Sequence, residues 1–129
     1  FYMTSPTAIS FFVIDDDFQM IELLSALLKD RGHQVSAYTS STVAMNEIES
    51  IRPDCLITDL VMGDMDGLEL VRELRSKPIH RDMKIVMVTS KTKDLWRNKA
   101  YKVGVDNFIT KPVDTNTFVS EIEAIFETS

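Results

Sequence analysis

Short runs rich in apolar residues alternate five times along the chain with segments whose apolar residues recur at helical spacing. The first run, residues 9–14, is apolar at nearly every position, which is typical of a strand buried on both faces. Further strands are expected at residues 34–38, 56–58, 84–88 and 107–110, and helices at residues 21–28, 42–50, 67–75, 94–102 and 116–126. Five strand–helix units in succession predict an α/β fold with one parallel sheet, right-handed crossovers and helices on both faces.

The length and charge of the chain limit the kind of protein it is. With 129 residues, 44% of them hydrophobic, one domain is expected over residues 9–129. Residues 1–8 show no periodicity, and we expect them to be either disordered or foreign to the natural chain. The net charge of −6 argues against direct nucleic-acid binding. Because no apolar run approaches the roughly 20 residues that cross a bilayer, and no leader pattern is seen, the expected location is the cytoplasm, away from membranes.

Several residues of kinds that often carry chemistry are expected to be structural here. Cys55 is the single cysteine and lies in an apolar run, which indicates a buried thiol in a reducing compartment rather than a nucleophile. His33 and His80 fall near predicted loops and are expected to be solvated. In the helix over residues 42–50, Val43 and Ile48 are expected to face the core.

Polar side chains follow four of the five predicted strands, at the point where each strand ends. In chain order they are Asp15-Asp16-Asp17, Asp59, Thr89-Ser90 and Lys111-Pro112. Ligands of parallel sheets bind outside the carboxyl ends of the strands, so these side chains are expected to surround one crevice.

The charges of that crevice indicate what fills it. Asp15, Asp16 and Asp59 contribute three negative charges, and Lys111 contributes one positive charge. Carboxylates that lie close together raise one another's pKa unless a cation intervenes. A divalent cation balances the remaining charge, and hard oxygen ligands favour Mg²⁺. Such a cluster suits phosphoryl transfer, in which positioning and charge neutralisation supply most of the catalysis.

Five sequence strings carry a resemblance to a known family. They are Val13-Ile14-Asp15-Asp16-Asp17, Leu56-Ile57-Thr58-Asp59-Leu60-Val61-Met62, Met65-Asp66-Gly67, Val88-Thr89-Ser90 and Phe108-Ile109-Thr110-Lys111-Pro112. In this order they resemble a response-regulator receiver domain, of the chemotaxis-receiver-like kind, from two-component signalling. The resemblance covers about residues 9–127. It implies a flavodoxin-like, doubly wound (βα)5 parallel sheet with the strand order 2-1-3-4-5.

The resemblance also implies roles for the acidic residues. Asp59 would accept a phosphoryl group from a phosphohistidine of a histidine kinase, forming a mixed anhydride. Mg²⁺ would be bound directly by Asp16, Asp59 and the main-chain carbonyl of Val61, and through water by Asp15. Asp17 is expected to be a solvated neighbour of this site.

For the later strands, the resemblance implies both chemistry and switching. Lys111 would pair with one phosphoryl oxygen, Thr89 would donate a hydrogen bond to another, and the Lys111–Pro112 peptide bond would be cis. Phe108 holds the position of the family's switch aromatic. Thr89 would move toward the phosphoryl group and the Phe108 ring would fill the vacated space, which repacks the surface of the fourth helix, fifth strand and fifth helix. The alternative is a ring that is permanently buried.

The implied function is that of a phosphorelay receiver, which catalyses only its own phosphorylation and dephosphorylation. Its implied partners are a sensor histidine kinase or phosphotransfer protein, an output domain or downstream protein, and a phosphorylation-dependent second copy. Trp96 lies among cations of the fourth helix. It either forms part of a partner patch or packs inward with the cations solvated, and the second interpretation is favoured.

Three positions depart from the family pattern or tune it. Members often carry Pro after the Met of the loop that follows the acceptor, whereas this chain has Gly63, which predicts a looser loop. Val61 and Lys91 stand two positions past Asp59 and Thr89, where the family tunes attack by water. Val61 cannot orient a water molecule and Lys91 can hold phosphoryl oxygens, so a long-lived phosphorylated state is predicted.

Two other classes of function remain open. In a phosphatase of the haloacid-dehalogenase type, Asp15 would be the nucleophile, with Thr89 and Lys111 in later motifs. The short chain and an unexplained Asp59 argue against it. In an interaction module that has lost the reaction, one of the acids, the Thr/Ser or the Lys is usually missing, and here all are present.

Overall fold

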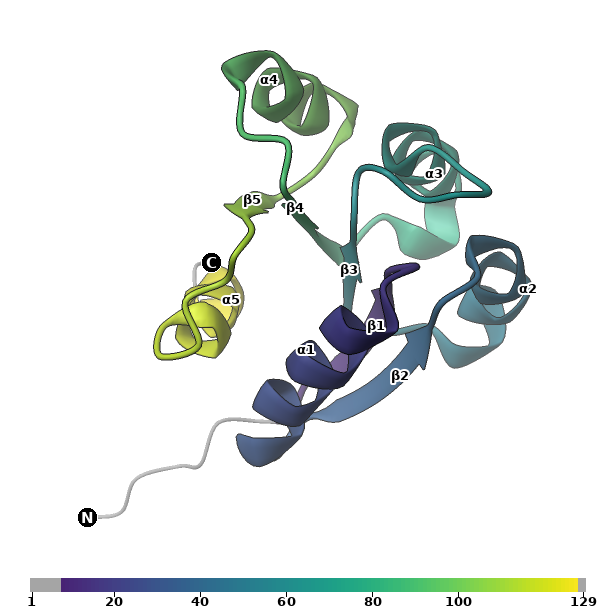
Figure 1. Ribbon diagram of the computed structural model, residues 1–129. Coiled ribbons are helices and arrows are strands. Elements are labelled where there is room, and N and C mark those ends of the chain that lie inside the picture. The colour runs from purple at the N-terminus through teal and green to yellow at the C-terminus, as the bar shows by residue number, and fades with distance from the viewer. Residues whose placement is uncertain (1–7, 128–129) are drawn as a thin grey trace.

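The computed structural model describes residues 8–127, which form five strands and five α-helices in strict alternation (Figure 1). The elements are β1 (Ser10–Ile14), α1 (Phe18–Asp30), β2 (Gln34–Tyr38), α2 (Ser41–Ile51), β3 (Cys55–Thr58), α3 (Gly67–Arg75), the short 3₁₀ helix η1 (Pro78–His80), β4 (Lys84–Thr89), α4 (Asp94–Val103), β5 (Asn107–Thr110) and α5 (Phe118–Glu127). The strands make one parallel sheet in the order β2-β1-β3-β4-β5. The predicted fold class and strand order are confirmed.

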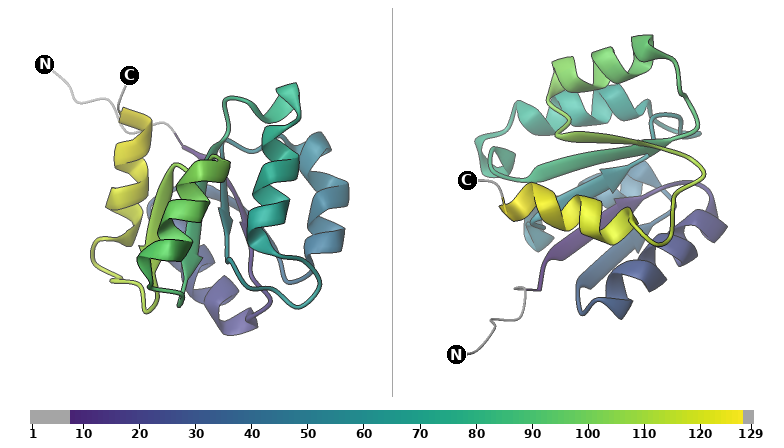
Figure 2. Two further views of the ribbon diagram at one scale, coloured as in Figure 1. Left: turned by 90° about the horizontal axis from the view of Figure 1, so that it is seen from above. Right: turned by 90° about the vertical axis from the view of Figure 1, so that its left-hand side faces the viewer.

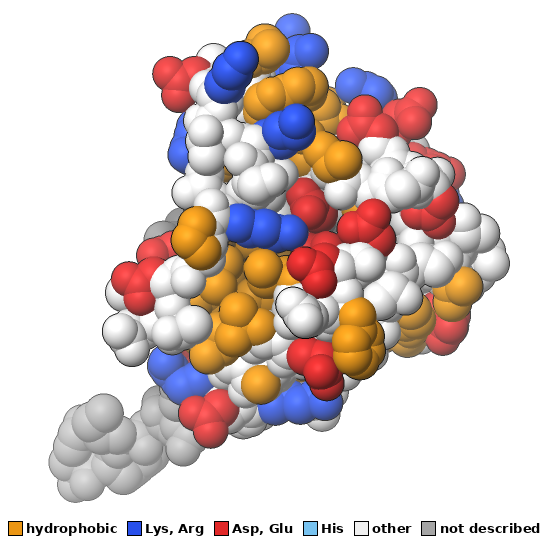
Figure 3. Space-filling view, in the orientation of Figure 1, with side chains coloured by type: hydrophobic (Ala, Val, Ile, Leu, Met, Phe, Trp, Pro, Cys, Tyr) orange, Lys and Arg blue, Asp and Glu red, His pale blue; other side chains and the backbone are white. Residues whose placement is uncertain are grey.

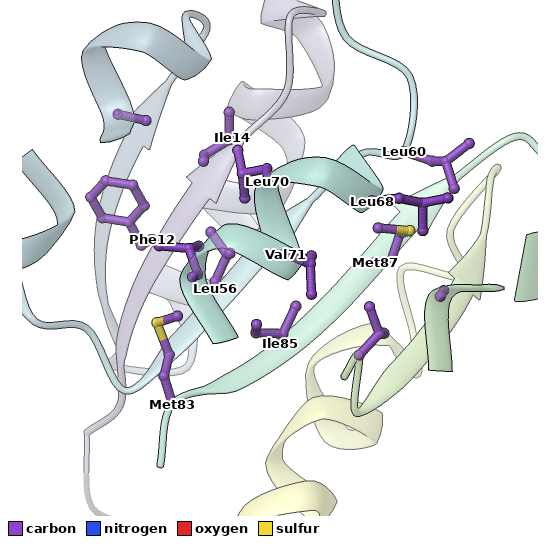
Figure 4. Close-up of a cluster of buried hydrophobic side chains, with 14 of the residues drawn as sticks. Phe12, Ile14, Leu56, Leu60, Leu68, Leu70, Val71, Met83, Ile85 and Met87 are labelled. Carbon is purple, nitrogen blue, oxygen red and sulfur yellow. The ribbon is translucent and has the colours of Figure 1, made fainter. Parts of the chain in front are cut away.

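The sheet separates two hydrophobic layers. On one face, side chains of β1, β3 and β4 such as Phe12, Leu56 and Ile85 pack against α2, α3 and α4 (Figure 4). On the other face, Phe11, Ile57 and Val86 are among those that pack against α1 and α5. Figure 2 shows the helices on the two faces of the sheet from two further sides. Since the central strands are buried on both faces, their sequences are apolar runs rather than alternating patterns.

Side-chain caps fix where three helices begin. Asp17 accepts a hydrogen bond from the Gln19 N–H at the start of α1, and Ser40 and Asp66 do the same for α2 and α3. Each cap satisfies one of the N–H groups that the first helical turn leaves without a partner. Helix α5 starts two residues later than predicted, at Phe118. The carbonyl of Asp114 accepts hydrogen bonds from the backbone N–H groups of Thr117 and Phe118, which closes a turn before the helix.

Helix α2 turns a different face to the core than the sequence suggested. Ile48 is buried as predicted, but the Val43 prediction is wrong, because 46% of this residue is exposed. Val43 and Ile48 are five positions apart, which places them about 140° apart around a helix. The buried side instead carries Ser41, Ala44 and Ile48, at spacings of three and four residues.

The prediction that both histidines are solvated is wrong, since His33 is 5% exposed and His80 is 2% exposed. His33 lies between the start of β1 and α5. Its Nδ1 accepts a hydrogen bond from the Ile9 N–H at 3.0 Å, its Nε2 lies 2.7 Å from Glu123 Oε2, and its ring meets the Phe11 ring edge-on. His80 ends η1, which packs beside α3. Both histidines are buried because elements distant in the sequence, or packed beside them, cover their side chains.

Cys55 is fully buried and free, as predicted. Burial raises the pKa of its thiol well above the ordinary range, so it stays protonated and unreactive. Across residues 8–127, every helix is too short or too polar to cross a bilayer.

Candidate functional site at the carboxyl ends of the strands

The site lies where β1, β3, β4 and β5 end at the same edge of the sheet. Pairing brings Ile14 beside Thr58 and Thr89 beside Thr110, so the residues that follow these strands emerge next to one another. Figure 3 shows acidic side chains gathered near the middle of this face, with Lys and Arg side chains around them. The parallel register itself therefore brings the residues predicted from the sequence to one edge of the sheet.

Lys111 joins two of the acids at the centre of the site. Its Nζ lies 2.9 Å from Asp15 Oδ2 and 2.8 Å from Asp59 Oδ2. Both carboxylates belong to buried residues, Asp15 being 2% and Asp59 8% exposed. Since an unpaired buried charge is costly, the ammonium group is what makes this pair of acids compatible with the fold.

The titration of the cluster reflects burial and pairing together. Burial raises the pKa of Asp15, and the hydrogen bonds from the Asp17 N–H and from Lys111 only partly oppose this. Burial alone would lower the pKa of Lys111, but its hydrogen bonds to Asp59 and Asp15 outweigh burial and raise it. Lys111 is therefore a permanent cation at neutral pH.

The backbone holds the Asp59 carboxylate from its other side. Asp59 Oδ1 accepts hydrogen bonds from the N–H groups of Leu60 at 2.6 Å and Val61 at 3.2 Å. Gly67, the first residue of α3, packs directly under this turn and donates its N–H to the Leu60 carbonyl at 2.8 Å. A Cβ atom at position 67 would lie 2.2 Å from the Asp59 carbonyl oxygen, so only glycine fits. Asp59 thus stands on a rigid turn.

Asp16 and Val61 lie at the exposed rim. Asp16 Oδ2 accepts a hydrogen bond from the Gly63 N–H at 3.0 Å, and the side chain makes no ion pair with Lys111. Val61 is 52% exposed and forms an isolated antiparallel bridge with Asp66. Asp17, which was expected to be a solvated neighbour, is exposed and caps α1.

The donor set suits a hard divalent cation, although it forms no closed cage. Within residues 8–127 no three His, Cys, Asp or Glu side chains are placed so that they could hold a metal ion among themselves. Two direct carboxylates and one main-chain carbonyl, as the resemblance implied, do not require such a group. The three acids and Lys111 leave a net charge of −2 to balance, and all the oxygens near Asp59 are hard ligands. The residues present therefore fit Mg²⁺.

Thr89 and Phe108, the expected switch pair, are both buried. Thr89 ends β4, is 1% exposed, and its Oγ1 accepts a hydrogen bond from the Lys91 N–H at 3.3 Å. Phe108 is 4% exposed, and the guanidinium carbon of Arg97 lies 4.9 Å from the centre of its ring. Its N–H also donates to the Tyr101 hydroxyl at 3.2 Å. The Phe108 ring in this state occupies the core beneath α4.

The region around Lys111 and α4 bears on two further expectations. The Lys111–Pro112 peptide bond is cis, as the resemblance implied. Trp96 is half-buried and packs against the core layer beneath α4, with Lys99 Nζ 5.3 Å from its ring centre. The inward-packed interpretation of Trp96 thus agrees with its burial. The same ring also borders a shallow cavity of about 480 Å³ whose other wall is the loop of residues 60–66.

Sequence reasoning missed two groups that shape the site. Asp64 bridges the loop after Asp59 to α2, because its carboxylate accepts hydrogen bonds from Ser41 Oγ and from the N–H and Oγ1 of Thr42. The Gly63 N–H, described above, is the other. A main-chain donor leaves no signal in a sequence, whereas an Asp three residues before an α3 glycine could have been recognised as a turn residue.

Comparisons with known proteins agree with this geometry. The family model described as the response regulator receiver domain matches residues 11–123. Among solved structures, the chemotaxis response regulator CheY4 of Vibrio cholerae is 24% identical, with a TM-score of 0.86 over 92% of this chain and 99% of that one. A putative response regulator from Chloroflexus aurantiacus is 24% identical, with a TM-score of 0.88 over 95% and 100%. The signal receiver domain of a signal transduction histidine kinase from Syntrophus aciditrophicus is 26% identical, with a TM-score of 0.83 over 93% and 91%.

At these low identities, the likeness to the solved structures establishes the fold alone. The family model covers most of the chain, including all four strand ends that build the site. This chain belongs to the response regulator receiver domains of two-component signalling.

Proposed function

We propose that this domain accepts a phosphoryl group on Asp59 from the phosphohistidine of a sensor histidine kinase or phosphotransfer protein. The observation that carries the proposal is the position of Asp59, held by two N–H groups on one oxygen and by Lys111 Nζ, 2.8 Å away, on the other. An acid in this position lies at the carboxyl edge of the sheet and is fixed in orientation, which is what an in-line attack requires.

The proposed reaction uses the neighbours of Asp59 for charge control. A carboxylate oxygen of Asp59 attacks phosphorus, the P–N bond of the phosphohistidine breaks, and the electron pair returns to the imidazole. Lys111 neutralises charge on the phosphoryl oxygens, and Thr89 offers them its hydroxyl. Mg²⁺, held by Asp16, Asp59 and the Val61 carbonyl with Asp15 outside, would supply further charge neutralisation. Receiver domains generally bind Mg²⁺ at the phosphorylation site.

The proposed output is a repacking of the surface made by α4, β5 and α5. Thr89 lies at the end of β4, and Phe108 lies one strand away on β5, opposite Met87. When Thr89 turns toward a phosphoryl oxygen, space opens beside Phe108, and the hydrogen bond of Phe108 to Tyr101 and the contact of its ring with Arg97 of α4 must rearrange. In this proposal, the path from Asp59 to the surface of α4 runs through Thr89 and Phe108.

Receiver domains are signalling domains rather than enzymes in the usual sense, and they act through histidine kinases or phosphotransfer proteins and output domains. For this chain we propose that catalysis is limited to its own phosphorylation and dephosphorylation. The exposed Leu95 and Tyr101 on α4 are candidates for contact with a downstream protein or with a second phosphorylated copy. Light scattering before and after phosphorylation distinguishes a homodimer from a monomer.

The decisive experiment identifies the modified residue. The purified protein is incubated with Mg²⁺ and acetyl phosphate, and separately with a phosphorylated kinase domain. Mass spectrometry should show one added phosphoryl group, which Asp59→Asn abolishes. Label on Asp15 instead would indicate the haloacid-dehalogenase type of chemistry. Failure of both donors to modify the protein would indicate an interaction module that does not carry out the reaction.

A further inference from the structure

The loop between β3 and α3 contacts the expected magnesium ligand Asp16 through a main-chain group. The Gly63 N–H donates to Asp16 Oδ2 at 3.0 Å, across 47 positions of sequence. Within the described residues no hydrogen bond engages the other oxygen, Oδ1, and Asp16 is exposed. One oxygen of this carboxylate is therefore fixed while the other is left for a ligand.

Position 63 does not need glycine for conformational reasons. Its φ angle is not among the positive values of the described chain, which occur at Arg52, Gly32 and Gly104. A Cβ atom at position 63 would meet only Asp16 Oδ2, at an ordinary 3.7 Å. What the position does require is a backbone N–H, which every residue except proline supplies. The sequence-based expectation of a looser loop therefore overlooked the hydrogen bond that this N–H makes.

The neighbouring residues hold the Gly63 N–H in place. Asp64 accepts hydrogen bonds from Ser41 Oγ at 2.5 Å and from Thr42, which ties the loop to the start of α2. At its far end, the loop returns through the Val61–Asp66 bridge. The donor that meets Asp16 is thus anchored on both sides, and a fixed outer partner of a metal-binding carboxylate sets its orientation.

We propose that the Gly63 N–H is a positioning group for the magnesium site: it holds Asp16 Oδ2 so that Oδ1 faces the ion. This inference rests on the proposed function, because it concerns the ligand set of that site. It goes beyond it by assigning a role to a residue at which this chain departs from its family's frequent proline. A proline at position 63 has no N–H and leaves Asp16 free to rotate away.

The first test compares Gly63→Pro with the conservative variant Gly63→Ala, which keeps the N–H. Mg²⁺ affinity is measured by calorimetry and by the fluorescence of Trp96, the single tryptophan, which borders the same loop. Gly63→Pro should weaken Mg²⁺ binding about 10-fold or more, the usual effect of losing an outer partner, while Gly63→Ala should bind as the wild type does. Urea unfolding of the wild type and of both variants in EDTA, without Mg²⁺, shows whether a substitution has damaged the fold.

The second test needs no substitution in the loop. The chain has four glycines, so protein labelled with ¹⁵N-glycine gives four amide signals. The Gly63 signal should move strongly upfield in Asp16→Ala, whereas Gly32 and Gly104, at turns before β2 and β5, should not move. An unmoved Gly63 signal overturns the inference even if Gly63→Pro fails to fold.

The outcomes separate the two proposals. If Gly63→Pro and Gly63→Ala both bind Mg²⁺ as tightly as the wild type does, the positioning role is overturned and the proposed function stands. Wild-type protein that does not bind Mg²⁺ overturns the magnesium part of the proposed function, and with it the positioning role. Weak binding confined to Gly63→Pro supports both.

Discussion

Single residues at the site are constrained by how closely the backbone of one element approaches another. Gly67 is the clearest case, since the Asp59 carbonyl and the Leu60 backbone occupy the space that any side chain would need. A Cβ atom at Gly63, only four positions earlier, would meet only Asp16 Oδ2, at an ordinary contact distance of 3.7 Å. Two glycines of one loop thus serve different physical purposes, one steric and one as a hydrogen-bond donor.

Gly67→Ala is expected to destabilise the fold by about 1–3 kcal/mol, the usual range for overpacking, because the new methyl group must displace backbone atoms. Urea unfolding measures the loss. Gly63→Ala is the matched control and should unfold at nearly the wild-type urea concentration. Equal stability of the two variants would show that the turn under Asp59 can move to make room.

His80 should make stability depend on pH. Burial lowers the pKa of its imidazole; the nearby Glu49 opposes this, and Lys77, Arg52 and Arg75 add a smaller lowering. Its Nε2 has no hydrogen-bond partner among the described residues. Between a pH of about 6.5 and the lowered pKa of the folded state, the unfolded chain binds a proton that the folded chain does not. The contribution of His80 to stability is therefore fully present above this range and falls as the pH drops through it.

The measurement compares urea unfolding at about pH 7.5 and about pH 5.5 for the wild type and for His80→Leu. The wild type should lose more stability between the two values than the variant does, because leucine cannot take up the proton. An identical loss in both proteins would show that His80 is not the group responsible.

Val61 and Lys91 are expected to prolong the phosphorylated state. Val61 is half exposed beside Asp59 but cannot orient water, and Lys91 follows Thr89 with an exposed side chain. In Val61→Asn and in Lys91→Glu the loss of phosphoryl group, followed by mass spectrometry after removal of the donor, should be faster than in the wild type. Unchanged rates in both variants would disprove this.

At the scale of elements, one side chain joins several of them. Arg75 at the end of α3 donates from Nε to the Gly104 carbonyl, from Nη1 to the His80 and Met83 carbonyls, and from Nη2 to Asp106 Oδ2. It thereby connects α3 with η1, with the start of β4 and with the turn before β5. A guanidinium group suits this position because its five donors have a fixed geometry.

Arg75→Ala should lower the free energy of unfolding by about 2 kcal/mol or more, since several carbonyl groups and Asp106 lose a charged donor at once. Chemical denaturation measures the change. The control is Lys77→Ala, which removes an exposed ion pair with Glu49 and should have little effect. Similar effects of the two substitutions would contradict the connecting role of Arg75.

At the scale of the whole molecule, the two ends of the sheet have separate tasks. The carboxyl ends of the strands carry the acids and Lys111, and the opposite end carries the connections made by Arg75 and the contacts of His33 with Ile9 and Glu123. Substitutions at the opposite end should therefore change stability more than phosphorylation, because they leave the Asp59 turn untouched.

The sequence alone determined the five strand–helix units, the buried strands and the meeting of Asp15, Asp59 and Lys111. Each of these follows from local patterns, because parallel strands necessarily bring their carboxyl ends to one edge. The tertiary structure decided the burial of His33 and His80, the core face of α2 and the Gly63–Asp16 hydrogen bond. The bonds of His33 and Gly63 join residues 24 to 90 positions apart, so their geometry leaves no short-range trace in the chain. In the same way, a main-chain donor looks the same in a sequence whether or not a carboxylate lies opposite it.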